Sequence, residues 1–289
     1  MSSKKTEGPV GRTKEQSQLA LKKKVRMFYD LQRLRMQTKG RTLPKGKKPG
    51  ESEKMEVELH EVDQAILDRR AEDLHKSEKL ALKDVAAHLK TMPIYTQILK
   101  DKTRFKGLGP TMAGVILSEN DIFRQDTVSK MWAFSGLAPV QAWRCTVCNN
   151  LVEPNGPAET KFHHISKLAE KSCKSVELPR QQVYQSGRAM RPTKGEKLPY
   201  NAFLKTKLIG VLGPCLLQAN SSWRSFYDNY KHRMQTSGKG VSDGHRHNMA
   251  IRYLVKMLLL EVWKEWRQIE GLPVRPSYHE EKMGHVHSG

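Results

Sequence analysis

Apolar residues recur at helical spacing through most of the chain, which predicts a mainly α-helical protein. Between residues 16 and 35 they alternate with basic side chains and predict a basic amphipathic helix. Between residues 57 and 89 they alternate with acidic side chains and predict a second, longer helix. The segment 38–53 between them is rich in Gly, Pro and Lys and is expected to be a loop. The two helices can therefore pair as an antiparallel hairpin or coiled coil.

The rest of the chain predicts short helices joined by turns, followed by two strong helical patterns between Leu198 and Gly271. Few segments alternate with period two, so any sheet is expected to be small. The domains expected from these patterns are a disordered basic tail (1–15), a helical hairpin or coiled coil (16–92), a helical nucleic-acid-binding domain (93–271) that carries a Cys- and His-bearing insertion (143–174), and a C-terminal tail (272–289).

Charge narrows the range of partners. The 289 residues include 51 Lys and Arg against 30 Asp and Glu, a formal net charge of +21. Such an excess attracts polyanions and releases counterions from them, so nucleic acid is the expected partner. No apolar run of about 18 residues or lipidation signal favours a membrane. The N-terminal residues hold no apolar signal core, so we expect a soluble, cytoplasmic protein.

Gly107 and Gly109 lie between an amphipathic run that ends at Phe105 and an apolar helix expected from Pro110 to Leu117. This order is typical of a helix-hairpin-helix, in which two glycines form a tight turn and the second helix directs its free N–H groups at a phosphate. An ordinary helix-loop-helix corner is the alternative. The cations that would flank such a phosphate are Lys102, Arg104 and Lys106.

The insertion carries residues with the spacing of zinc ligands: Cys145, Cys148, His163, His164 and Cys173. A Cys-x2-Cys pair forms half of a tetrahedral zinc site, and one His with one Cys can complete it. Four protein ligands would make the zinc structural, and the pattern leaves open which histidine binds. Reduced, unligated thiols and a metal-dependent nuclease finger are the alternatives.

Ser186 lies in a polar loop among cations that could bind a nucleic-acid backbone: Arg180, Arg188, Arg191, Lys194 and Lys197. A serine there could attack a phosphodiester while the cations stabilise the developing charge; an ordinary turn serine is the alternative. Further along, Ser242 and Asp243 are candidates to cap the last long helix. Arg246 lies in the first turn of that helix, where we expect polar capping or phosphate contact; metal binding is the alternative.

Four motifs occur in order between residues 95 and 267: GLGPTMAGVILSE, then FSGLAP, then RQ followed shortly by SGR, then KGEKLPYNAFLKTKL. The succession resembles the C-terminal transposase domain of the bridge-RNA-guided insertion-sequence transposases. That resemblance implies that Ser186 is the recombination nucleophile. Two departures oppose it: the first hundred residues lack the ribonuclease-H-like domain of that family, and residues 198–200 read Leu-Pro-Tyr where the family has a basic Leu-Arg segment.

A helical hairpin followed by a Gly-Leu-Gly-Pro helix also resembles the Nop domain of box C/D small nucleolar ribonucleoproteins. The related Tas proteins use tandem interspersed guide RNAs to target DNA, and some consist of little beyond the Nop-like part. This resemblance implies a Nop-like domain that binds a structured guide RNA and a coiled coil that dimerises.

We therefore expect a guide-RNA-binding protein for RNA-guided DNA targeting, with a structural zinc ion and no nuclease domain of its own. Its expected partners are guide RNA, target DNA and a second copy of the chain. One alternative is a serine recombinase or transposase that uses Ser186, the only one of these readings that is an enzyme. The other is an architectural DNA-binding protein without a guide.

Overall fold

The computed structural model describes residues 13–42, 60–138, 140–144, 151–152, 181–185, 198, 200–238 and 242–276, with only the backbone described in its strands. The described chain is mainly α-helical, as predicted. It forms two compact units, Met1–Asp121 and Ile122–Gly289. This division falls later than the boundary expected near residue 93, because a helix after that position packs against the hairpin.

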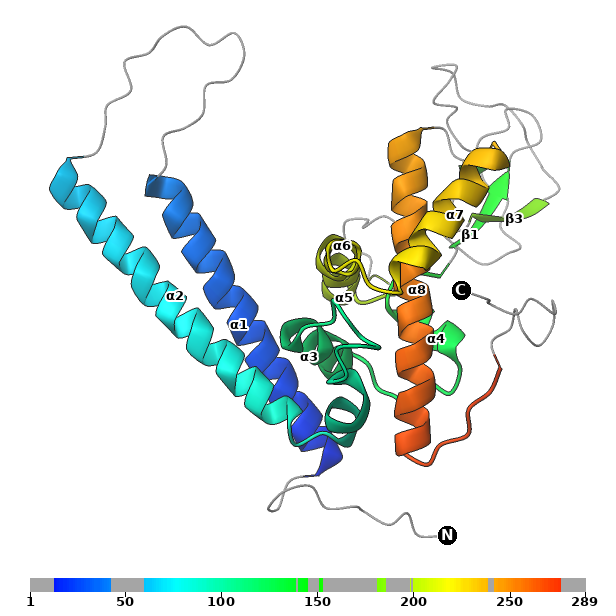
Figure 1. The fold of residues 1–289 in the computed structure, drawn as a ribbon, viewed down its shortest axis with the longest axis horizontal. Helices are drawn as coiled ribbons and strands as arrows, with labels where there is room; N and C mark the ends of the chain where they lie inside the picture. Colours follow the sequence, from blue (N-terminus) through cyan, green and yellow to red (C-terminus); the bar gives the residue numbers. More distant parts are fainter. Residues whose placement is uncertain are drawn as a thin grey trace, which may run out of the picture. The chain divides into compact units, whose positions relative to one another are not determined.

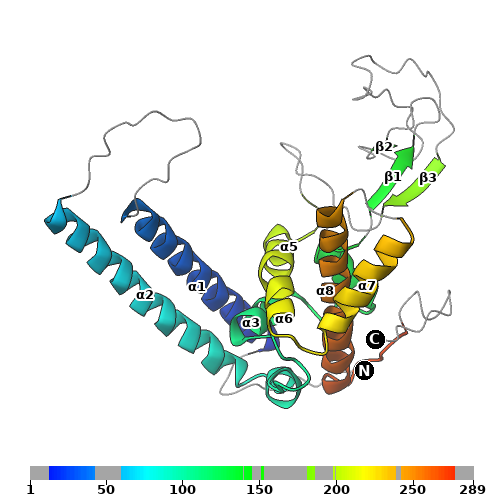
Figure 2. The same cartoon turned by 45° about the horizontal axis from the view of Figure 1, so that its top comes forward.

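The first unit is built on two long helices, α1 (Lys14–Thr42) and α2 (Glu61–Leu89), which lie side by side and run antiparallel (Figures 1 and 2). Their buried seam joins Leu21, Val25 and Phe28 of α1 to Ala81, Val85 and Leu89 of α2. Burial of this apolar stripe is the main source of hairpin stability.

Helix α1 extends further than its sequence suggested. We expected a loop from residue 38, but the helix continues through Gly40 to Thr42. A glycine costs about 1 kcal/mol in a helix, and the hydrogen bonds of a long preceding helix can offset that cost. The remainder of the expected loop, residues 43–53, and the first residues of the second expected helix, 57–59, lie outside the described residues.

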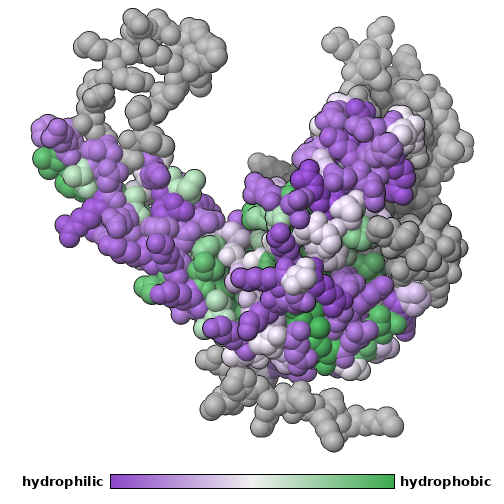
Figure 3. Space-filling view, viewed as in Figure 1, coloured by the Kyte–Doolittle hydropathy of each residue, from purple (hydrophilic) through white to green (hydrophobic). Residues whose placement is uncertain are grey.

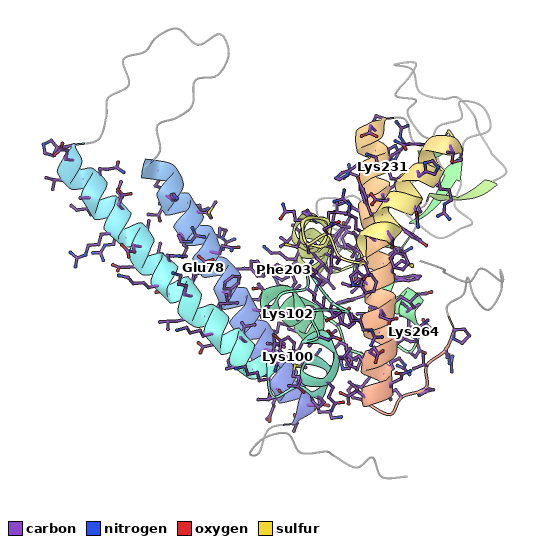
Figure 4. All side chains as sticks on the ribbon, viewed as in Figure 1. Glu78, Lys100, Lys102, Phe203, Lys231 and Lys264 are labelled. Carbon is purple, nitrogen blue, oxygen red and sulfur yellow. The ribbon has the colours of Figure 1, made fainter. Side chains whose placement is uncertain are left out.

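Charged contacts complement the seam, as the opposite charges of the two helices predicted. Glu78 of α2 accepts hydrogen bonds from Arg35 and Gln32 of α1 and lies between the two helices (Figure 4). Nearer the end of α2, Ser17 Oγ lies 3.0 Å from His88 Nε2 in a second polar contact.

A short π-helix, η1 (Tyr95–Leu99), leads through turns to α3 (Pro110–Glu119), which packs against both hairpin helices. Gly114 makes this approach possible, because a Cβ there would lie 3.0 Å from Val85 Cγ1 and 3.1 Å from Val25 Cγ2. The end of α3 is held by Glu119, whose fully buried carboxylate pairs with Lys22 at 3.1 Å and Arg26 at 2.7 Å.

The second unit contains α4 (Val128–Phe134), α5 (Ala202–Lys207), the π-helix η2 (Leu208–Leu212), α6 (Gly213–Gln218), α7 (Arg224–Thr236) and α8 (Asp243–Ile269). Helix α8 is the core element, since α4, η2, α6 and α7 all pack against it. Its predicted cap is confirmed: Ser242 Oγ accepts a hydrogen bond from the N–H of His245 at 3.2 Å. Asn201 caps α5 and Thr127 caps α4 in the same way.

The C-terminal part of α8 is fixed to the start of this unit by polar side chains. Trp263 donates its indole N–H to the carbonyl of Gln125 at 2.8 Å. The guanidinium of Arg267, almost fully buried, donates to the carbonyls of Ile122 and Pro273. These bonds satisfy a buried cation with backbone dipoles in place of a carboxylate.

Three short strands form a small antiparallel sheet of order β2-β1-β3: β1 (Val140–Arg144), β2 (Leu151–Val152) and β3 (Gln181–Gln185). Arg144 pairs with Leu151, so the six residues 145–150 connect these antiparallel strands along the chain. Cys145 and Cys148 belong to that connection, and Ser186 directly follows β3. The end of β1 and all of β2 therefore lie within the expected insertion (143–174), and β3 follows it.

Candidate nucleic-acid interface

The Gly-Leu-Gly segment forms a tight turn before α3. Asp101 Oδ1 opens it by accepting backbone N–H bonds from Thr103 at 2.8 Å and Arg104 at 3.3 Å. These bonds lower the pKa of the Asp101 carboxyl. Gly107 has φ +96°, a left-handed conformation that favours glycine. Gly109 is then the N-cap of α3.

The N-terminus of α3 is open. Gly109 supplies no side-chain cap, and a Cβ on it would meet no heavy atom within 4 Å. Pro110 occupies the first turn, where its missing N–H costs no hydrogen bond. The remaining N–H groups of the turn and the helix dipole attract an anion at this position.

The three predicted flanking cations differ in their surroundings. Lys102 and Lys106 are exposed, and no acidic residue within the described ranges pairs with either. The Arg104 guanidinium lies 5.4 Å from the ring centroid of buried Phe105 and is partly covered. Figure 4 places Lys102 and Lys100 on this segment.

The element before the turn differs from the sequence expectation. A continuous amphipathic run to Phe105 was expected, whereas the π-helix ends at Leu99 and residues 102–107 are turns. The Asp101 cap explains the difference, because its side chain accepts the N–H bonds that a continuing helix would have used.

Arg246 lies in the first turn of α8 and is partly buried. One position further, His247 Nδ1 lies 2.6 Å from Tyr227 Oη of α7 in a hydrogen bond. The neighbouring aromatic residues form a stack in which the Tyr230 and Tyr253 rings are 4.6 Å apart and Arg233 lies 4.9 Å from the Tyr230 centroid.

Sequence reasoning missed three cations in the second unit: Lys205 of α5 and Arg252 and Lys256 of α8. All three are partly buried, and none forms an ion pair with a carboxylate among the described residues. Arg252 and Lys256 are one turn apart, so they share a face of α8. Two basic residues four apart in the otherwise apolar run IRYLVKMLLL could have revealed them.

Burial makes these cations electrostatically unfavourable in the free protein. It lowers the pKa of Lys256 to about 8 and also lowers the pKa of the Arg252 guanidinium. Burial, with a smaller contribution from the positive charge of Arg252, lowers the pKa of Lys205. Aromatic faces offset part of the cost: Lys256 Nζ lies 4.6 Å from a Trp132 ring centroid and Lys205 Nζ lies 4.8 Å from that of Tyr200.

The predicted zinc ligands and the Ser186 cluster lie outside the described residues: Cys145, Cys148, His163, His164, Cys173, Arg180, Ser186, Arg188, Arg191, Lys194 and Lys197. Among the described residues, no group of three or more His, Cys, Asp or Glu side chains could hold a metal ion. Both predictions therefore stay predictions.

Figure 3 shows a largely hydrophilic face over the hairpin, interrupted by small hydrophobic patches. In the part of the chain that the structure describes, no helix combines the length and apolarity that a membrane crossing requires. The exposed hydrophobic side chains include Leu34 and Met36 of α1 and Val62 and Ile66 of α2.

Comparison with protein-family models and with curated proteins finds no match to this chain.

Proposed function

We propose that this protein binds a structured guide RNA and uses it to target DNA, without a nuclease domain of its own. The observation that carries the proposal is the open N-terminus of α3 with the exposed cations Lys102 and Lys106 beside it. In a chain of net charge +21, this arrangement suits contact with phosphate and backbone more than readout of bases.

The order of elements supports the resemblance to Nop domains. A long antiparallel hairpin precedes a Gly-Leu-Gly-Pro turn and a buried helix, as in the pattern that suggested the family. Gly107 with its positive φ, followed by an N-capping Gly109, further supports a turn of the helix-hairpin-helix type in this position.

The binding test titrates the purified protein with a structured RNA at increasing salt. We expect log affinity to fall linearly with log salt, with a slope that corresponds to several phosphate contacts. Affinity that does not change with salt, or no binding at about 50 mM salt, would contradict the proposal. Tight binding to duplex DNA with no preference for structured RNA would favour an architectural DNA-binding protein.

A structural zinc ion in the insertion is part of the proposal. Its support is that Cys145 and Cys148 fall among the six residues that separate the antiparallel strands β1 and β2 in the sequence, with a Cys-x2-Cys spacing that suits two thiolate ligands of one metal. Metal analysis of protein purified without chelator is expected to give about one zinc per chain. Replacement of Cys148 by Ser should remove the metal, whereas replacement of Cys215, a free cysteine of α6, should not.

We further propose that the hairpin forms a homodimer. The support is that Leu34, Met36, Val62 and Ile66 are large apolar side chains left exposed on its two helices, where a partner could bury them. Light scattering should give the mass of two chains for the wild type and of one chain for a Leu34→Lys, Ile66→Lys variant. A monomeric wild type would contradict the proposal.

A further inference from the structure

We infer that Lys205, Arg252 and Lys256 form a second backbone-binding site, in which α5 and α8 hold consecutive phosphates of a nucleic-acid strand. This inference rests on the proposed function, since it names the part of the strand that the second unit recognises. The site belongs to the second unit alone and does not depend on the Gly-Leu-Gly turn.

The arrangement of the three side chains supports a row of cations. Arg252 and Lys256 are four residues apart on α8, about 6 Å along the helix axis. Lys205 projects from α5, close enough to Arg252 for the guanidinium charge to act on its ammonium group. Gly136, with φ +68°, allows Tyr200 and Lys205 to approach: a Cβ there would lie 2.7 Å from Tyr200 Cδ2 and 2.9 Å from Lys205 Cδ.

The positive charges of Lys205, Arg252 and Lys256, here called the row, are not neutralised by a carboxylate among the described residues. Like charges repel each other, and partial burial deprives each of water, so the free protein is destabilised by holding them together. Three other half-buried cations are neutralised by carboxylates: Lys22 and Arg26 share that of Glu119, and Arg35 pairs with Glu78. Buried Arg267 is satisfied by backbone carbonyls. Among the described residues, no carboxylate serves the row in this way.

A phosphodiester strand can neutralise the three cations of the row better than a single small anion can. The planar guanidinium of Arg252 can donate two parallel bonds to one phosphate, while each lysine adds a point charge beside it. Three cations spread over two helices can hold more than one phosphate, and the contacts would be independent of base sequence. The Trp132 and Tyr200 rings each contact one of these lysines, so their role in the site is to position the cations.

The first experiment uses inorganic phosphate as the probe and thermal unfolding as the measurement, against chloride at equal ionic strength. The variants are Arg252→Gln and, as a matched control, Lys130→Gln, which removes a cation that Asp126 already neutralises at 2.7 Å. We expect phosphate to raise the Tm of the wild type and the control but not of Arg252→Gln. Without phosphate, Arg252→Gln should unfold at the wild-type temperature or higher, because the substitution removes the repulsion between Arg252 and Lys205.

The second experiment measures the affinity of the same three proteins for a structured RNA as salt is varied. Arg252→Gln should bind about tenfold more weakly, with a salt slope shallower by about 0.7–0.9 for each phosphate that the variant no longer binds, while Lys130→Gln matches the wild type. If the wild type binds RNA and all three proteins have equal affinities and slopes, the inference is wrong although the proposed function stands.

Two other outcomes are also decisive. A lower Tm for Arg252→Gln without phosphate, with unchanged RNA affinity, would show that the Arg252 side chain stabilises the fold without a phosphate, and would overturn the site. If the wild type binds no RNA, the proposed function fails. A phosphate effect that still depends on Arg252 would then identify a site for free phosphate and overturn the assignment to a strand.

Discussion

Arg35 of α1 donates from Nε to Oε2 of Glu78 of α2, and this ion pair joins the two helices beyond the end of their buried apolar seam. Gln32 donates to the other oxygen at 3.1 Å, so both carboxylate oxygens are satisfied. The pair fixes which residues of the two helices lie opposite each other, because a shifted register would leave a nearly buried carboxylate without its donors.

Replacement of Glu78 by Ala should destabilise the protein by about 2 kcal/mol, because Arg35 and Gln32 lose their acceptor. Urea unfolding followed by helical circular dichroism measures the change. Glu72→Ala is the control, since Glu72 pairs with Lys76 on the exposed face and should cost less than about 0.5 kcal/mol. Equal effects of the two substitutions would contradict the role of Glu78.

The same pair predicts a dependence on pH. Burial raises the pKa of Glu78, but the hydrogen bonds from Arg35 and Gln32 outweigh it and hold the pKa below its usual 4.5. Its contribution to stability is therefore fully present above about pH 4.5 and is lost as the pH falls through the lowered folded-state pKa. A Glu78→Gln variant should lose less stability than the wild type on acidification below about pH 4.5.

A larger side chain at position 114 should disrupt the packing of α3 against the hairpin. A larger residue there must push Val85 and Val25 apart, so Gly114→Leu should destabilise the protein by about 1–3 kcal/mol. Gly210→Leu is the matched control, because a Cβ at Gly210 meets no heavy atom within 4 Å. Thermal unfolding compares the two variants. A Gly114→Leu protein with the Tm of the control would show that α3 is not held closely against the hairpin.

The cations of the Gly-Leu-Gly turn predict a change in RNA binding. A Lys102→Gln, Lys106→Gln variant should weaken binding and reduce the slope of log affinity against log salt by about 0.7–0.9 for each phosphate that it no longer binds. Filter binding across a salt series measures both quantities. Lys83→Gln removes an exposed cation of α2 and should change neither; equal effects of the two variants would indicate general attraction without a site.

Lys256 predicts opposite effects of pH on stability and binding. Its pKa is about 8 in the folded protein against a usual 10.5, so the unfolded chain binds more protons between these values and stability rises with pH there. The gain is at most about 3 kcal/mol, since one pKa unit corresponds to about 1.4 kcal/mol. Lys256→Met should lack this rise, which unfolding curves at about pH 7.5 and about pH 9.5 measure.

RNA affinity should fall as the pH rises, opposite to the change in stability. Loss of the Lys256 proton above about pH 8 removes a positive charge from the row, so RNA affinity should fall as the pH rises. Lys256→Arg keeps its charge and should show a smaller fall. Identical pH profiles for the wild type and both variants would remove Lys256 from the interface.

The sequence predicted the parts of the fold that depend on periodicity. The hairpin, the long final helix and the Ser242 cap follow from the spacing of apolar residues and a local capping pattern. The grouping of α3 with the hairpin was not predictable, because it depends on the contact of Gly114 with Val25 and Val85, residues far apart in the sequence.

The site was predictable where charge and glycine lie close together in the sequence. Lys102, Lys106, Gly107 and Gly109 fall within eight positions, so a local pattern identified the turn. Lys205 and Arg252 are far apart in sequence, and the fold brings them close because η2, which directly follows α5, packs against α8. The apolar run around Arg252 is a sequence signal for its partial burial, but the approach of Lys205 to it depends on the folded protein.

The most direct test of the central claim is to sequence the RNA that remains bound after a high-salt wash of the purified protein. The account predicts discrete short RNAs of one repeated architecture, bound by the wild type and largely absent from a variant that lacks Lys102, Lys106 and Arg252. Heterogeneous fragments in proportion to their cellular abundance, or no RNA at all, would contradict guided targeting.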